Sequence, residues 1–135
     1  MKTLILTCTP DKFDIVSFFQ NNEEIVWKQT ASCEVGYYAY IYVGRPISSL
    51  RYCCEVIETN IVDGECLPYH CDTTMPRSRR QRRYMRLKLL REIKNNELSL
   101  ERLRAHGLKT VQCITVATDE LKEYIEKTVR EQNLL

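Results

Sequence analysis

The chain has 135 residues, enough for one hydrophobic core but not for two, so we expect a single domain over residues 1–135. Its hydrophobic fraction of 44% is ordinary for a globular protein, and no stretch approaches the 18 apolar residues of a membrane span. The seven cysteines are odd in number and irregularly spaced. Their pattern argues against a disulfide-rich secreted fold and favours free thiols in the cytoplasm.

The chain opens with a pattern typical of a strand followed by a helix. The apolar run TLILTC, residues 3–8, predicts a buried strand. Thr9 as N-cap and Pro10 at the first helical position then predict a helix. The residues expected on its core face are Phe13, Val16 and Phe19.

Four further strands are predicted from runs of β-branched and aromatic residues. They cover 23–29, 37–44, 50–62 and the alternating YMRLKLL of 84–90. The segment 66–83 between the last two contains two prolines and little periodicity, which predicts a loop. Within YMRLKLL the expected inner face carries Met85, Leu87 and Leu89, and the expected polar face carries Tyr84, Arg86 and Lys88.

The C-terminal third predicts two helices around one short strand. Ser99 is a candidate N-cap flanked by a hydrophobic staple of Leu98 and Leu103, and Gly107 is the expected helix end. The strand VQCITV and a helix capped by Thr118 follow. Because consecutive strands are joined by short turns, we expect an α+β fold with a mixed, mostly antiparallel curled sheet or pseudo-barrel flanked by helices.

Positive charge is concentrated in one segment of the chain. Residues 77–91 carry eight Lys and Arg and no acidic residue, whereas the remainder has 12 basic and 18 acidic residues, a balance of −6. A basic segment on an acidic body favours a polyanionic partner. The phosphate-binding candidates are Arg45, Arg79, Arg80, Arg82, Arg83 and Arg86.

The sequence contains none of the common catalytic or phosphate-loop motifs, so we expect no enzyme activity. Cys66, His70 and Cys71 could ligate zinc in principle, but the usual second pair of ligands is missing downstream, and we expect no metal and no cofactor. His106 lies at a helix end, where the helix dipole favours a histidine without any catalytic role.

Several segments together resemble a known family. LILTCTPDKFD, IVWKQT and EVGYYAYIYVGRPISSLRYCCEVIE are similar, in this order, to the EVE domains of the PUA-like superfamily, which are relatives of YTH domains. YMRLKLL, LRAHGLKTVQ and DELKEYI extend the resemblance to small bacterial proteins and to nearly the whole chain. Two departures are TCTP where the family has KSEP, and Tyr37 where an aspartate is usual.

The resemblance implies a module that holds a flipped, modified nucleobase of DNA or RNA in an aromatic cage, with methylated adenine or modified cytosine as the group's ligands. Trp27 matches the first cage wall, Lys28 follows it, and Tyr42 and Tyr84 are candidates for a second wall. Thr7, Cys8 and Thr9 match the segment that meets the phosphate and the base edge. Related domains are fused to nucleases of modification-dependent restriction, so a separate nuclease chain is an expected partner.

Two other functions stay open at this point. PUA-like relatives of the ASCH type suggest a small-molecule hydrolase, for which Lys28 with Cys8 or Glu55 would be the reactive set. The basic segment could instead serve a protein-interaction adaptor that binds an acidic partner.

Overall fold

The structure is a computed structural model that describes residues 3–11, 13–28, 33–62, 83–93, 98–108 and 115–133. The elements are, in chain order, β1 (Thr3–Cys8), α1 (Ile15–Asn21), β2 (Glu24–Lys28), β3 (Tyr38–Val43), β4 (Ser49–Val62), β5 (Arg83–Glu92), α2 (Leu100–Ala105), β6 (Thr115–Val116) and α3 (Asp119–Asn133). Every strand and helix predicted from the sequence is therefore present, although the segment 66–82 of the predicted loop and residues 111–114 lie outside the described residues.

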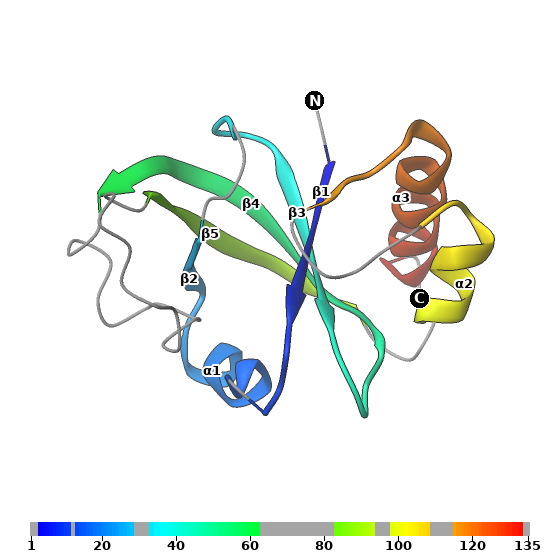
Figure 1. Ribbon diagram of the computed structural model, residues 1–135, viewed down its shortest axis with the longest axis horizontal. Helices are drawn as coiled ribbons and strands as arrows, with labels where there is room; N and C mark the ends of the chain where they lie inside the picture. The colour runs from blue at the N-terminus through cyan, green and yellow to red at the C-terminus, as the bar shows by residue number, and fades with distance from the viewer. Residues whose placement is uncertain are drawn as a thin grey trace.

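The described strands form one six-stranded sheet in the order β2-β5-β4-β3-β1-β6. The β1–β3 pair is parallel, and the other four pairs are antiparallel. Register shifts interrupt the β3–β4 and β4–β5 ladders, and such irregularities increase the bend and twist of a strand. Figure 1 shows the resulting curled sheet, with α1 below β2 and with α2 and α3 side by side beyond β1. The predicted mixed, mostly antiparallel sheet is confirmed.

The buried residues form two large hydrophobic cores, one on each face of the sheet, because successive strand residues point to opposite faces, whereas the chain length predicted a single core. The α1-side core includes Leu6, Cys54 and Ile15 of α1. The α3-side core includes Ile5, Cys53, and Leu121, Ile125 and Val129 of α3. The adjacent Cys53 and Cys54 thus lie on opposite faces of the sheet, and both are free thiols.

The start of α1 differs from the sequence prediction. Asp14, not Thr9, is the N-cap, and its carboxylate accepts from the Ser17 backbone N–H at 3.2 Å. Thr9 and Pro10 form a turn instead, closed by a 3.1 Å hydrogen bond from Phe13 N–H to the Thr9 carbonyl. Ile15 is the buried residue of α1, and Phe13 and Phe19 pack against the core as predicted, whereas Val16 is 38% exposed.

The caps of α2 and α3 follow the sequence prediction. The Ser99 side chain accepts from Arg102 N–H, and the Thr118 hydroxyl accepts from Leu121 N–H at 3.3 Å. Both staple residues before and within α2, Leu98 and Leu103, are fully buried. Gly107 follows α2 at φ +107°, a conformation that favours glycine, so the predicted helix end is confirmed.

Candidate nucleic-acid interface

Trp27 and Cys8, two of the predicted base-binding residues, share the α1-side core. Trp27 lies in β2 opposite Met85 of β5 and is 6% exposed, and Cys8 at the end of β1 is 3% exposed. Half-buried aromatic rings pack against this core from α1 and the turn before it: Phe13, Phe18 and Phe19. The Phe19 ring contacts Tyr52 with centroids 4.7 Å apart. The α1 side of the sheet is thus rich in aromatic side chains.

The carboxyl ends of β1 and β3 meet at one corner of the sheet, where Thr9 and Arg45 lie. The two strands are parallel, and Gly44 N–H donates to the Cys8 carbonyl at 2.9 Å. Thr9 and Arg45 follow directly after these two residues and are both exposed. The structure therefore brings one predicted phosphate-binding cation next to the predicted base-edge segment.

Three other predicted base-binding residues, Thr7, Tyr42 and Tyr84, lie on the opposite face of the sheet. Tyr42 belongs to the α3-side core, and Thr7 is its register partner on β1. Tyr84 forms a small separate cluster with Val26 and Ile61. The backbone of Lys28 pairs with Tyr84 at the end of β2. The predicted residues therefore do not form a single aromatic cage, because the sheet separates Tyr42 and Tyr84 from Trp27.

The cations of β5 alternate with its core residues as the sequence predicted. Met85 and Leu87 are fully buried, whereas Lys88 is exposed and Arg86 is half-buried. Arg86 forms ion pairs with Glu58 at 3.1 Å and Glu24 at 3.8 Å, so its charge is partly balanced.

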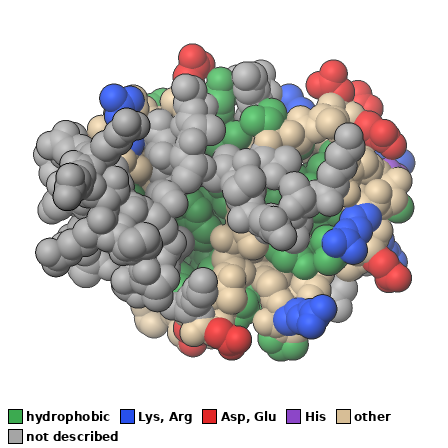
Figure 2. Space-filling model, in the orientation of Figure 1, with side chains coloured by type: hydrophobic (Ala, Val, Ile, Leu, Met, Phe, Trp, Pro, Cys, Tyr) green, Lys and Arg blue, Asp and Glu red, His purple; other side chains and the backbone are tan. Residues whose placement is uncertain are grey.

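Of the remaining predicted phosphate-binding residues, only Arg83 is within the described part of the chain. It is exposed and donates to the Asn60 side-chain oxygen at 3.4 Å. Arg79, Arg80 and Arg82 lie outside the described residues. On the face shown in Figure 2, acidic side chains gather at the upper part of the α2–α3 side and basic side chains lie mostly below them, so the described residues there carry both signs.

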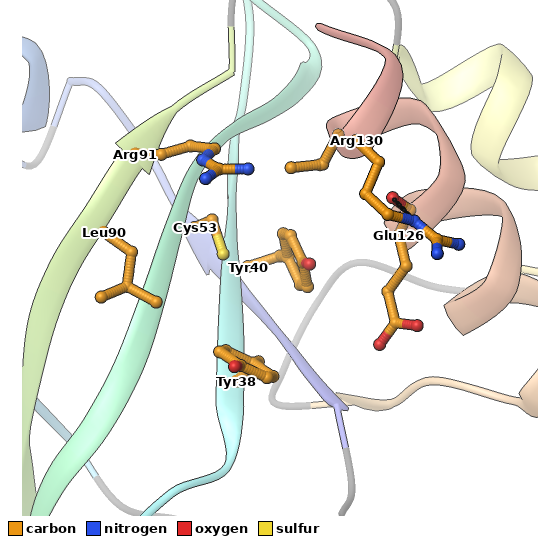
Figure 3. Close-up of a pocket in the computed structure, with 8 residues that line it drawn as sticks. Tyr38, Tyr40, Cys53, Leu90, Arg91, Glu126 and Arg130 are labelled. Carbon is orange, nitrogen blue, oxygen red and sulfur yellow. Dashed lines mark hydrogen bonds between the residues drawn. The ribbon is translucent and has the colours of Figure 1, made fainter. Parts of the chain in front are cut away.

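A cavity of about 330 Å³ opens where α3 meets β3, β4 and β5. Its lining residues are Tyr38, Tyr40, Cys53, Leu90, Arg91, Glu126, Val129 and Arg130 (Figure 3). Of these residues, only Arg91 had a predicted role, as the last cation of the basic segment 77–91. The alternation of Tyr38, Tyr40 and Tyr42, which places all three rings on one face of the strand, was the other sequence signal for this cavity. The lining residues of α3 could not be predicted, because their position depends on how the helix packs on the sheet.

The thiols near both faces are neutral at physiological pH. Burial raises the pKa of Cys8 to about 12, and the nearby Asp14 carboxylate adds to the rise. Burial likewise raises the pKa of Cys53. Cys8 faces the α1-side core, whereas Glu55 of β4 points to the other face, like Cys53. These two residues of the hydrolase hypothesis thus do not share a pocket, and neither thiol is activated.

Within the described ranges, no group of three His, Cys, Asp or Glu side chains is arranged to hold a metal ion. The zinc candidates Cys66, His70 and Cys71 lie outside those ranges. No helix in the described part of the chain is both long and apolar enough to cross a membrane. The ring of His106, at the end of α2, stacks on Tyr124 of α3 with centroids 3.7 Å apart and 10° between the ring planes, which is a structural role.

Solved structures with the same fold cover almost the entire chain. A hypothetical protein from Leishmania major matches with a TM-score of 0.69 at 14% identity, over 98% of this chain and 97% of that one. A Pseudomonas putida protein matches with a TM-score of 0.65 at 15% identity, over 93% and 98%. A variant of an ASCH protein from Zymomonas mobilis matches with a TM-score of 0.62 at 11% identity, over 94% and 98%.

No protein-family model matches the sequence, and a search of curated proteins finds no match either. At 11–15% identity, the structural similarity shows the fold alone. ASCH proteins belong to the PUA-like superfamily. The curled mixed sheet, its flanking helices and these structural neighbours together show that the chain has an α+β fold of the PUA-like type.

Proposed function

We propose that this protein is a nucleic-acid-binding module that recognises a single unstacked nucleobase, as the resemblance of its motifs to EVE domains implies. The observation that carries the proposal is the PUA-like fold, in which Trp27 and Cys8 belong to one aromatic-rich cluster on the α1 side of the sheet. A base taken out of its stack needs an aromatic surface in exchange, worth roughly 1–3 kcal/mol per base. In this proposal Trp27 supplies that surface, and Cys8 and Thr9 at the end of β1 meet the base edge, whereas the predicted Thr7 lies on the opposite face of the sheet.

The phosphates are held by cations around this side of the molecule. Arg45 lies at the corner where β1 and β3 end, and Arg83 lies at the start of β5. Arg86 contributes less, because Glu58 and Glu24 already balance its charge. The concentration of cations over residues 77–91 supports a polyanionic partner.

Base modification is the finer part of the proposal. A methyl group on the base adds roughly 0.8 kcal/mol of burial, which corresponds to about a fourfold gain in affinity. We therefore expect a modest preference for methylated cytosine or adenine. A separate nuclease chain would then convert recognition into restriction.

The test titrates single-stranded and duplex oligonucleotides, with and without these modified bases, and follows the fluorescence of Trp27, the only tryptophan. Saturable quenching that is stronger for the modified base is the expected result. Arg45→Gln should reduce the slope of log affinity against log salt by about one, whereas Arg104→Gln, on the exposed surface of α2, should leave it unchanged. No binding at low salt would contradict the nucleic-acid proposal, and binding without quenching would contradict base recognition by Trp27.

A further inference from the structure

The cavity beside α3 is on the face of the sheet opposite Trp27. Its floor is formed by Tyr40 of β3 and Cys53 of β4, which are register partners. Both side chains are at least 95% buried. Because burial raises the pKa of both side chains and keeps them neutral, the floor favours an apolar part of a ligand.

The two exposed apolar side chains at the rim are unusual for a strand surface. Tyr38 is 39% exposed and Leu90 is 43% exposed, and both line the cavity. An exposed tyrosine ring can stack on a planar ligand, and the neighbouring leucine extends the apolar surface. The volume of about 330 Å³ lies at the lower end of the range for small-molecule sites.

Opposite charges stand at the two ends of this cavity. In Figure 3, the Arg91 side chain extends from β5 at the end next to Cys53, whereas the Glu126 carboxylate extends from α3 at the end where Tyr38 lies. Among the described residues, neither of them forms an ion pair, in contrast to Arg86 on the same strand, which binds two glutamates. The Arg130 guanidinium lies along α3 and donates to the Glu126 carbonyl at 3.4 Å. Arg91 is therefore the cation available to an anionic ligand.

We propose that this cavity binds a nucleotide, with the phosphate on the Arg91 guanidinium and the base stacked on Tyr38. A guanidinium offers paired N–H donors that match phosphate oxygens. The Glu126 carboxylate accepts hydrogen bonds from the base edge, and guanine, with adjacent N1–H and amino donors, matches its two oxygens best. The nucleotide is either a free monophosphate or one residue of a single strand. This site is separate from the proposed Trp27 site and does not depend on it.

Calorimetric titration of the intact protein with the four nucleoside 5′-monophosphates and the four nucleosides tests the proposal. We expect GMP to bind most tightly and guanosine to bind about tenfold more weakly or worse, because it lacks the phosphate. Arg91→Gln should weaken GMP binding about tenfold or more. Lys127→Gln, which removes a charge from an exposed position of α3 outside the cavity, is the matched control and should leave it unchanged.

Two further variants test the base contacts. Tyr38→Ala should weaken GMP binding about five- to 150-fold, and Tyr38→Phe should retain it, because only the ring is required. Glu126→Gln should remove the preference for GMP over the other monophosphates. Circular dichroism confirms that each variant folds, and Tyr38 and Arg91 are exposed enough for substitution without loss of the core.

An eight-nucleotide single strand with one guanine distinguishes the two sources of the nucleotide. Tighter binding of the strand than of GMP, lost in Arg91→Gln, assigns the site to nucleic acid, whereas binding of GMP alone assigns it to a free nucleotide. If neither GMP nor the strand binds, or if Arg91→Gln and Tyr38→Ala leave the affinity unchanged, the proposal is overturned. Trp27→Phe should not alter GMP binding, so the experiments distinguish a wrong cavity proposal from a wrong Trp27 proposal.

Discussion

Ile5 and Leu6 are neighbours in β1, but they are buried in different cores. Each is at most 1% exposed, Ile5 on the α3 side and Leu6 on the α1 side. Substitution of either by alanine removes three carbons, which costs about 2.4 kcal/mol of transfer free energy. The cavity left behind adds to this cost, for a total of about 3–4 kcal/mol. Since the urea midpoint is the free energy of unfolding divided by the m-value, we expect each variant to lower the midpoint by about 1–3 M.

The assay monitors urea unfolding with two signals in parallel. Trp27 fluorescence reports on the α1-side core, and helical circular dichroism reports mainly on α3, the longest described helix. If the central sheet couples both cores into one cooperative unit, Ile5→Ala shifts both signals to the same new midpoint, although Trp27 lies on the other face. Leu6→Ala should do the same. Separate midpoints for the two signals would refute the view that one sheet makes the two cores a single folding unit.

Two other predictions concern a thiol and a helix cap. Burial raises the pKa of Cys8 from 9.0 to about 12, so unfolding releases a proton above pH 9, and the free energy of unfolding should be highest below pH 9 and fall as the pH approaches 12. Urea midpoints at pH 8 and pH 10 measure this loss, and the loss should be smaller in Cys8→Ala. An equal loss in that variant would contradict the assignment to Cys8. Ser99→Ala removes the side-chain acceptor of Arg102 N–H and should lower the free energy of unfolding by about 1 kcal/mol. In the same denaturation assay, Ser99→Asp should restore most of this loss. An unchanged free energy of unfolding in Ser99→Ala would show that the cap contributes nothing.

Local patterns predicted most of the fold because each depends on residues close in sequence. The Ser99 cap, the Leu98–Leu103 staple and Gly107 at the end of α2 are such patterns, and all three are confirmed. The same kind of reasoning was wrong for α1. Thr9 and Pro10 satisfy the usual start signals, but the chain forms a turn there, and Asp14 with Ser17 provides the stronger cap five residues later.

The candidate sites were harder to predict because they combine faces of distant elements. The sequence assigned Tyr42 and Tyr84 to the same cage as Trp27, but the face of each residue follows from strand alternation and register across the β4–β5 ladder. Arg91 and Glu126 both line the cavity beside α3, although they are 35 positions apart in the sequence. They reach the same cavity only because α3 packs on the β3–β4–β5 surface. Arg91 belongs to the basic segment 77–91, which predicted a polyanionic partner, but the amphipathic pattern of α3 carries no functional signal for Glu126.

The position of β1 in the sheet has a consequence for synthesis of the chain. β1 is made first, yet it lies between β3 and β6, and β2 can pair only when β5 has emerged. At a translation rate of 5–20 residues per second, roughly 4–15 s pass between the synthesis of β3 and the synthesis of β6, the second neighbour of β1. During that interval one edge of an apolar strand is unpaired, which is the geometry most prone to pairing with another chain. The protein should therefore depend more on chaperones while it is being translated than when it refolds from denaturant.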